Sequence, residues 1–125
     1  MLRAIRSVLK PGGRTAFLAI QPTAGITRTE RRRANRIGPV AVALRSPYEN
    51  MLATAGFVDI GFEDLTTQYR DTQAGWIAAF NRREPEIRAI RGDQVFVESQ
   101  EDRVRTLASI DSGILSRYMF WATNP

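Results

Sequence analysis

The sequence contains no cysteine and no histidine. These absences exclude thiol nucleophiles, disulfides, metal sites built from cysteine or histidine, and imidazole acid–base chemistry. Long hydrophobic runs are missing as well, since no stretch approaches the roughly 20 apolar residues of a membrane span. Near the start, Arg3, Arg6 and Lys10 interrupt the apolar pattern, which argues against a signal peptide. We therefore expect a cytoplasmic protein without a membrane segment.

Lysine is almost absent, because seventeen arginines stand against one lysine in a chain of net charge +5. A GC-rich coding sequence is the simpler explanation of this bias, although a basic chain can contact nucleic acid or anionic lipid. Five arginines gather at positions 28, 31, 32, 33 and 36. On a helix, Arg28, Arg32 and Arg36 would form one stripe. We favour the interpretation that these arginines form a solvent-exposed helix face. The alternative is that they bind phosphate groups. No aromatic residues interleave, so nucleic acid is not the expected partner.

The first twenty residues predict a helix, a tight turn and a strand. Pro11-Gly12-Gly13 would end the helix, because proline disfavours helical geometry in the residue before it and glycine tolerates a sharp reversal. Residues 14–20 are nearly all apolar, which is typical of a strand buried on both faces. The apolar residues at helical spacing before the turn are Leu2, Ile5, Val8 and Leu9.

A second helix–strand unit is expected from Ser46 onward. Serine at the N-cap, Pro47 at the first helical position and Glu49 at the third predict a capping box and a helix over 47–55. Gly56 would end this helix. The alternation over 57–65 predicts a half-buried strand. Its inward side chains would be Val58, Ile60 and Phe62.

The remaining sequence predicts helices followed by a closing strand. Asp71 or Thr72 would cap a helix that turns Trp76 inward together with Ile77 and Phe80. A short helix from Glu84 to Gly92, a long helix over 93–112 and a last strand over 114–122 follow. We expect the 125 residues to form one domain, with 24–45 as a connector that caps it and a short helix over 40–44.

Two short motifs and the order of the segments resemble the C-terminal half of a class I methyltransferase that depends on S-adenosylmethionine (SAM). In that family a Leu-Lys-Pro-Gly-Gly turn leads into strand five, as Leu9 to Gly13 do here. A helix that ends in Ala-Gly-Phe leads into strand six, as Ala55 to Phe57 do here. A final aromatic strand, matched by 113–125, runs antiparallel between the two. The resemblance implies an α/β fold with a three-strand mixed sheet, equivalent to strands five, seven and six, flanked by helices.

The resemblance also implies methyl transfer from SAM to a small-molecule acceptor. The family holds SAM with a glycine-rich loop after strand one and an acidic residue that ends strand two, and neither has a counterpart here. We therefore assign no catalytic, cofactor-binding or metal-binding residue. We expect SAM to bind only if another half completes the fold, and we expect the chain alone to be inactive.

Ligands in open α/β sheets bind beyond the carboxyl ends of the parallel strands. That position makes Gln21, Thr23 and Tyr69 the candidate substrate-binding residues. Ordinary loop polarity for Gln21 and Thr23, and core packing for Tyr69, are the simpler interpretations of the same residues.

Two other functions stay open: a non-catalytic partner of a full-length methyltransferase, and a small basic nucleic-acid-binding module. In the family a further strand lies beside strand five, so the segment from Thr15 to Ile20 would present unpaired backbone groups at an open edge. This segment contains neither proline nor charge, and such an edge is a template for pairing with another chain. We therefore expect a homo-oligomer, or a partner chain, at this edge.

Overall fold

The computed structural model describes residues 1–37 and 46–125, so the helix expected over 40–44 lies outside the described residues. The order of elements is the one predicted: helix, strand, helices, strand, helices, strand. The helices are α1 (Leu2–Val8), α2 (Arg28–Ile37), α3 (Tyr48–Thr54), α4 (Thr66–Arg82), α5 (Glu84–Arg91) and α6 (Asp93–Asp111). The strands are β1 (Arg14–Pro22), β2 (Val58–Asp64) and β3 (Leu115–Thr123).

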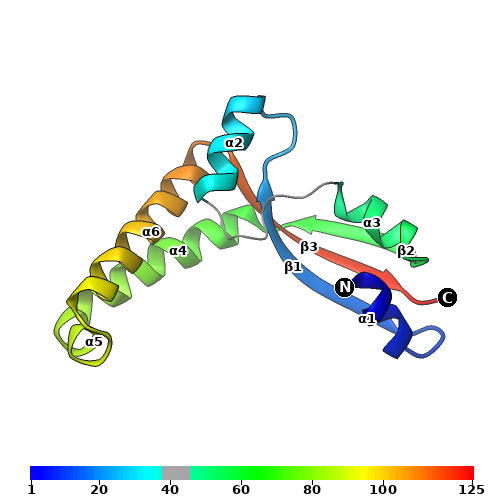
Figure 1. Cartoon of the computed structure of the whole chain (residues 1–125), viewed down its shortest axis with the longest axis horizontal. Coiled ribbons are helices and arrows are strands. Elements are labelled where there is room, and N and C mark those ends of the chain that lie inside the picture. Colours follow the sequence, from blue (N-terminus) through cyan, green and yellow to red (C-terminus); the bar gives the residue numbers. More distant parts are fainter. Residues whose placement is uncertain (38–45) are drawn as a thin grey trace.

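The three strands form one sheet in the order β1-β3-β2 (Figure 1). Strand β3 runs antiparallel to both neighbours, and Phe120 lies opposite Phe17 on one side and Phe62 on the other. The outer strands therefore point in the same direction without being hydrogen-bonded to each other. This arrangement confirms the topology predicted for strands five, seven and six.

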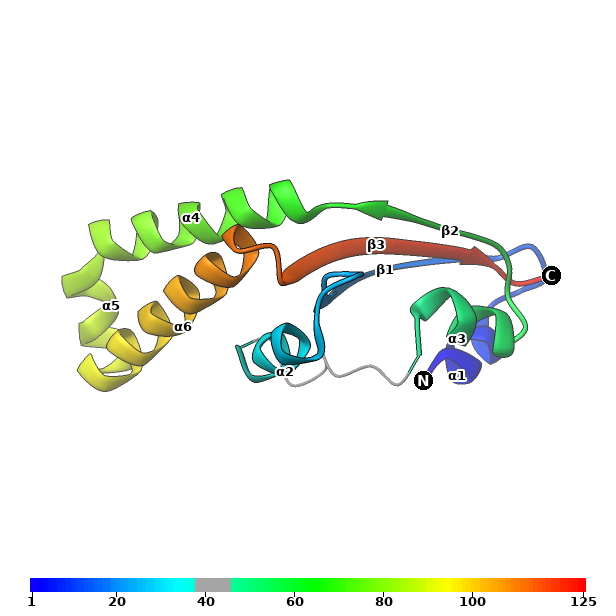
Figure 2. The same ribbon diagram turned by 90° about the horizontal axis from the view of Figure 1, so that it is seen from above.

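Helices α1 and α3 lie together on one face of the sheet (Figure 2). Three aromatic rings join the layers there: Phe17 stacks on Phe120 at 5.6 Å between ring centroids, and Tyr48 lies 5.2 Å and 5.1 Å from these two rings. Burial of such rings stabilises the fold in proportion to the apolar surface removed from water. The buried members of this first core are Leu2, Ala19, Leu52, Ala55, Phe57, Phe120 and Ala122.

Up to Ala19, strand β1 is covered on one face only, so the expectation of burial on both faces is wrong there, although Ile20 on the other face packs against a second core. Phe17 and Ala19 point toward the first core, whereas Leu18 between them is 57% exposed. Side chains alternate across a strand, and α1 and α3 cover only the face of Phe17. Val8, expected in the core, is also exposed on α1.

Strand β2 alternates less regularly than predicted. Its register against β3 shifts between Val58 and Gly61, and Asp59 has a positive φ of 49°. Val58 and Phe62 are exposed, against expectation. Gly61 is required where it stands, because a Cβ there would lie 2.5 Å from the indole ring of Trp121.

Helices α4, α5 and α6 form an arm that extends beyond the end of the strands (Figures 1 and 2). Because α4 begins at Thr66, Asp71 and Thr72 lie inside the helix and the predicted cap at these residues is wrong. Trp76 is 52% exposed rather than turned inward. The bounds of α5 and α6 agree with the prediction, and Gly92 separates them with a φ of 89°.

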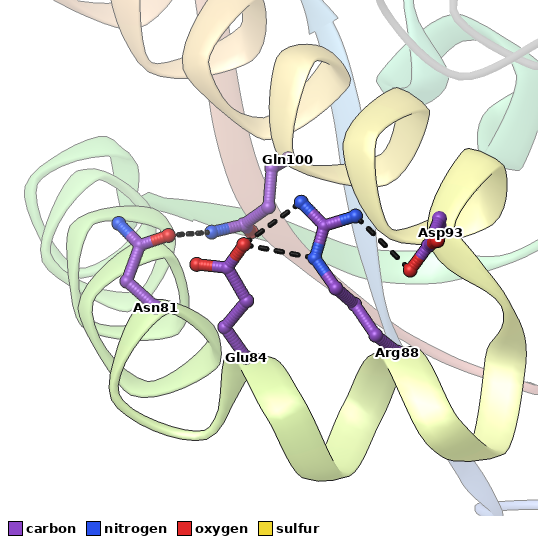
Figure 3. A network of polar contacts seen from close by, with 5 residues as sticks. All are labelled: Asn81, Glu84, Arg88, Asp93 and Gln100. Carbon is purple, nitrogen blue, oxygen red and sulfur yellow. Dashed lines mark hydrogen bonds and ion pairs between the residues drawn. The ribbon is translucent and has the colours of Figure 1, made fainter.

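Polar contacts connect the helices at the tip of the arm, where Phe96 is also buried. Arg88 is paired with Glu84 at 2.8 Å and with Asp93 at 3.3 Å, and Gln100 donates a hydrogen bond to Asn81 (Figure 3). Among the described residues, no helix combines the length and the apolar character needed to cross a membrane.

Two helix caps differ from the expectation. Helix α3 starts after Pro47, and no side-chain hydrogen bond caps it, so the capping box predicted at Ser46 is wrong. A capping box is present instead at α2. The Thr27 N–H donates to the Glu30 carboxylate at 2.8 Å, and the Glu30 N–H donates to Thr27 Oγ1 at 3.1 Å. The sequence Thr27-Arg28-Thr29-Glu30 carries the signal for a capping box as clearly as Ser46-Pro47-Tyr48-Glu49 does.

Candidate functional site

The candidate site lies where the carboxyl ends of β1 and β2 flank the amino end of β3. The central strand ties the two ends together through Arg117. Its carbonyl oxygen accepts a hydrogen bond from the Leu65 N–H at 2.8 Å, and its own N–H donates to Thr66 Oγ1 at 3.2 Å. The first turn of α4 is therefore attached to β3, and the residues that follow β1 and β2 meet at one edge of the sheet.

Gln21 and Thr23 lie at this edge on the β1 side. Gln21 is opposite Ser116 in the register of β1 and β3. The Thr23 N–H donates to the Ile114 carbonyl oxygen at 3.0 Å, and the Thr23 and Ser116 hydroxyl oxygens are 2.7 Å apart. Ser116 is buried. The Thr23 hydroxyl thus already holds the end of β1 against β3, while Gln21 is half-buried and makes no such contact within the described residues.

Tyr69 reaches the same end of the sheet from α4, but its ring belongs to a second core. It is 4% exposed, and the other buried members of this cluster are Ala34, Ile110, Ile114 and Leu115. Burial raises the pKa of the Tyr69 hydroxyl, and the charge of Arg117 and a hydrogen bond with Gln73 partly oppose that rise. Core packing is therefore the main role of this ring in the described structure.

Two polar residues that the sequence analysis did not select meet at Tyr69. The Arg117 guanidinium carbon lies 4.8 Å from the centroid of the Tyr69 ring. Gln73, one helical turn after Tyr69, is 8% exposed. A signal existed for Arg117, since it is the only charged residue among the nine from Ile114 to Ala122. For Gln73 the only signal in the sequence was its spacing of four residues from Tyr69, which places both on one face of a helix.

Helix α2 lies beside this end of the sheet and contributes Ala34 to the second core. The arginines at 28, 31, 32, 33 and 36 are all exposed, and none forms an ion pair with another described residue. Arg28, Arg32 and Arg36 project from the side opposite Ala34, given the period of the helix. This part of the expected 24–45 cap is therefore a helix with a basic outer surface.

A groove of about 660 Å³ lies at the opposite edge of the sheet. Its lining includes Arg6, Gly56 and Asn124. Arg6 and Gly56 lie before the amino ends of β1 and β2, and Asn124 follows the carboxyl end of β3. Ligands in open α/β sheets bind at carboxyl ends, so this groove is remote from the candidate site.

No family model and no curated protein matches the chain. Solved structures that are similar in fold include methyltransferases and a cyclopropane synthase. A phosphoethanolamine N-methyltransferase 2 from Haemonchus contortus has a TM-score of 0.80 at 17% identity, over 99% of this chain and 29% of that one. A putative sarcosine dimethylglycine methyltransferase from Galdieria sulphuraria has a TM-score of 0.83 at 15% identity, over 98% of this chain and 46% of that one. The cyclopropane synthase MmaA2 from Mycobacterium tuberculosis has a TM-score of 0.76 at 17% identity, over 98% of this chain and 48% of that one.

The chain thus spans less than half the length of each structure that it matches. Nearly all of its own residues are covered, and the matched region includes the antiparallel central strand β3. The chain therefore has the fold of part of a class I SAM-dependent methyltransferase.

Proposed function

We propose that this chain forms the acceptor side of a SAM-dependent methyltransferase and that the acceptor is a small molecule. One observation carries the proposal: the β1-β3-β2 sheet with its helical arm superimposes over nearly its whole length on methyltransferases of small amines. The cofactor in this proposal is SAM, bound by a partner segment or chain. The cytoplasmic location expected from the composition belongs to the same proposal.

The chemistry of methyl transfer is compatible with acceptor binding by this chain and SAM binding by a partner segment or chain. The reaction is a displacement at the methyl group of a sulfonium, and an enzyme accelerates it mainly by aligning donor and acceptor and excluding water. Residues at the carboxyl ends of β1 and β2 are in the place where an open α/β sheet holds its ligand. Gln21, Thr23 and Tyr69 are the residues that we propose for acceptor binding.

The proposal includes the expectation that the chain alone is inactive. In doubly wound folds a glycine-rich loop lets the backbone approach the cofactor. The paired glycines of this sequence, Gly12 and Gly13, instead form the turn between α1 and β1. Tight SAM binding would therefore need residues from elsewhere.

Ligand binding tests both halves of this proposal. In saturation-transfer NMR with the intact chain, we expect signals from small acceptors such as sarcosine and phosphoethanolamine, and calorimetry should show no binding of SAM. Substitution of Thr23 by valine removes the hydroxyl at similar size and should weaken acceptor binding. Micromolar SAM binding by the chain alone, or acceptor signals unchanged in Thr23→Val, would contradict the proposal.

A nucleic-acid-binding module is the second candidate, and the exposed arginines of α2 are the observation in its favour. Binding that neutralises phosphates weakens steeply with salt. Titration of duplex DNA at two salt concentrations should show only weak binding, because no aromatic platform accompanies the arginines. Tight binding at physiological salt that is lost in Arg28→Gln/Arg32→Gln would favour this candidate over methyl transfer.

A further inference from the structure

Arg117 has no acidic partner among the described residues, whereas three other arginines have one. Arg70 is paired with Asp111, Arg88 with Glu84 and Asp93, and Arg105 with Asp102. The Arg117 side chain forms no ion pair or hydrogen bond with another described residue, and its Nε is buried without a partner. Residues 38–45, the part of the chain left undescribed, contain no aspartate or glutamate.

The position of Arg117 makes this lack of a partner informative. It lies opposite Ile20 near the carboxyl end of β1, and its backbone holds Leu65 and Thr66 at the carboxyl end of β2. A guanidinium stacked on a tyrosine ring is partly shielded from water and fixed in orientation. A fixed and unpaired guanidinium presents two parallel N–H donors to a carboxylate or a phosphate.

Gln73 supplies a second unpaired atom, its Oε1, beside the same tyrosine. More than nine-tenths of the residue is buried, and its Oε1 has no hydrogen-bond partner in the described structure. A buried amide oxygen without a partner is destabilising, so native proteins rarely leave one without a hydrogen bond. The two unpaired atoms differ in kind, since Arg117 Nε donates and Gln73 Oε1 accepts. One ligand that carries an anion and a neighbouring donor could satisfy both.

We propose that Arg117 and Gln73 form a binding point for a small anionic group, a carboxylate or a phosphate, at the carboxyl ends of β1 and β2. Arg117 holds the anion through its forked N–H groups, and Gln73 accepts a hydrogen bond from an N–H or O–H next to it. Tyr69 positions both side chains. Only the identification of the ligand as a methyl acceptor rests on the proposed function. Binding of the anion itself needs neither SAM nor methyl transfer.

An NMR titration of the intact chain tests the site directly. Inorganic phosphate and acetate are added separately, with chloride holding the ionic strength constant, and the Arg117 Nε–H resonance is followed. We expect saturable shifts with one of the two anions, which then identifies the anionic group. Arg117→Gln should weaken binding about tenfold or more, since a hydrogen bond to a charged group contributes on the order of 1.5–3 kcal/mol.

Arg103→Gln is the matched control. Arg103 is also stacked on an aromatic ring, 3.9 Å from the Phe80 centroid, and also lacks a described ion pair, but it lies in the arm. The same loss of charge there should leave anion binding unchanged. If Arg117→Gln does not fold, Arg117→Lys keeps the charge without the fork and should weaken binding as well. Shifts that do not saturate, or equal weakening by Arg103→Gln, would overturn the proposal of an anion site. Either result would leave the proposed methyltransferase function untouched, because that function is tested separately by acceptor and SAM binding.

Discussion

The side chain of Arg6 donates a hydrogen bond to the side chain of Asn124 at 3.1 Å, across 118 positions of the sequence. Arg6 also donates to the Ala55 carbonyl oxygen at 3.3 Å, and the Asn124 amide donates to the carbonyl oxygens of Leu9 and Lys10 at 2.9 Å and 3.2 Å. The two short motifs that carry the family resemblance are therefore joined in space, through one arginine and one asparagine near the chain end.

Asn124→Ala should destabilise the fold by about 1–3 kcal/mol, because the partners of a buried amide lose their hydrogen bonds. Asn124 is 8% exposed, so water replaces these contacts poorly. Urea unfolding followed by circular dichroism measures the change. Asn50→Ala, at an exposed position of α3, is the control and should have little effect. Equal midpoints for the two variants would mean that the Asn124 contacts contribute nothing net.

The observed caps predict opposite results for two similar substitutions. Thr27→Ala removes the hydroxyl that caps α2 and should cost about 1 kcal/mol. Ser46→Ala removes a hydroxyl that makes no capping bond at α3 and should leave the unfolding temperature nearly unchanged. Thermal melts of both variants check this pair. A larger loss in Ser46→Ala than in Thr27→Ala would restore the cap that the sequence predicted.

Alkaline pH should destabilise the protein through Tyr69. Its pKa is raised in the folded state by burial, so the folded state favours the neutral hydroxyl. An unburied tyrosine is half ionised at pH about 10, so the contribution of Tyr69 to stability is fully present well below that pH and falls as the pH rises through the folded pKa. Denaturant unfolding between neutral and alkaline pH measures this slope, and Tyr69→Phe should flatten it. A slope that is the same in both proteins would assign the effect to other groups.

Strand β1 should mediate self-association. Among the described residues it is hydrogen-bonded on one side only, to β3, and Leu18 is exposed beside that open edge. A second copy can pair with it in antiparallel fashion about a twofold axis. We predict a dimer whose interface exceeds the roughly 1,000 Å² expected of a biological contact.

Light scattering on two charge variants tests this dimer. Leu18→Lys places a charge at the edge and should give a monomer, whereas Val104→Lys on α6, at a side chain of similar exposure, should remain dimeric. A folded, monodisperse monomer for the unchanged protein would show that β1 does not pair between copies.

Local signals in the sequence predicted those turns, helix ends and strands that depend mainly on the backbone preferences of neighbouring residues. The turn at Pro11-Gly12-Gly13, the stop at Gly92 and the closing strand depend on the φ preferences of proline and glycine and on alternation, and all are present. The order of the strands was also accessible, but through resemblance to a family rather than through periodicity.

Burial and contacts between distant segments could not be predicted in the same way. Whether Leu18, Trp76 or Val8 is covered depends on which face of an element meets another element, and periodicity does not identify the covering partner. The candidate site shows the same division. Gln21 and Thr23 were identified from their place after a strand, whereas the meeting of Arg117 with Gln73 on Tyr69 joins residues from β3 and α4.

The sequence by itself determined the α/β class, the succession of elements and the absence of thiol and imidazole chemistry, because composition and local backbone preference act on neighbours in the chain. The tertiary structure alone decided which polar groups are paired. Arg6 is hydrogen-bonded to Asn124, while Arg117 Nε and Gln73 Oε1 are buried without a hydrogen-bond partner among the described residues. Pairing depends on distance in space and on exclusion of water, and neither is encoded in the spacing of residues along the chain.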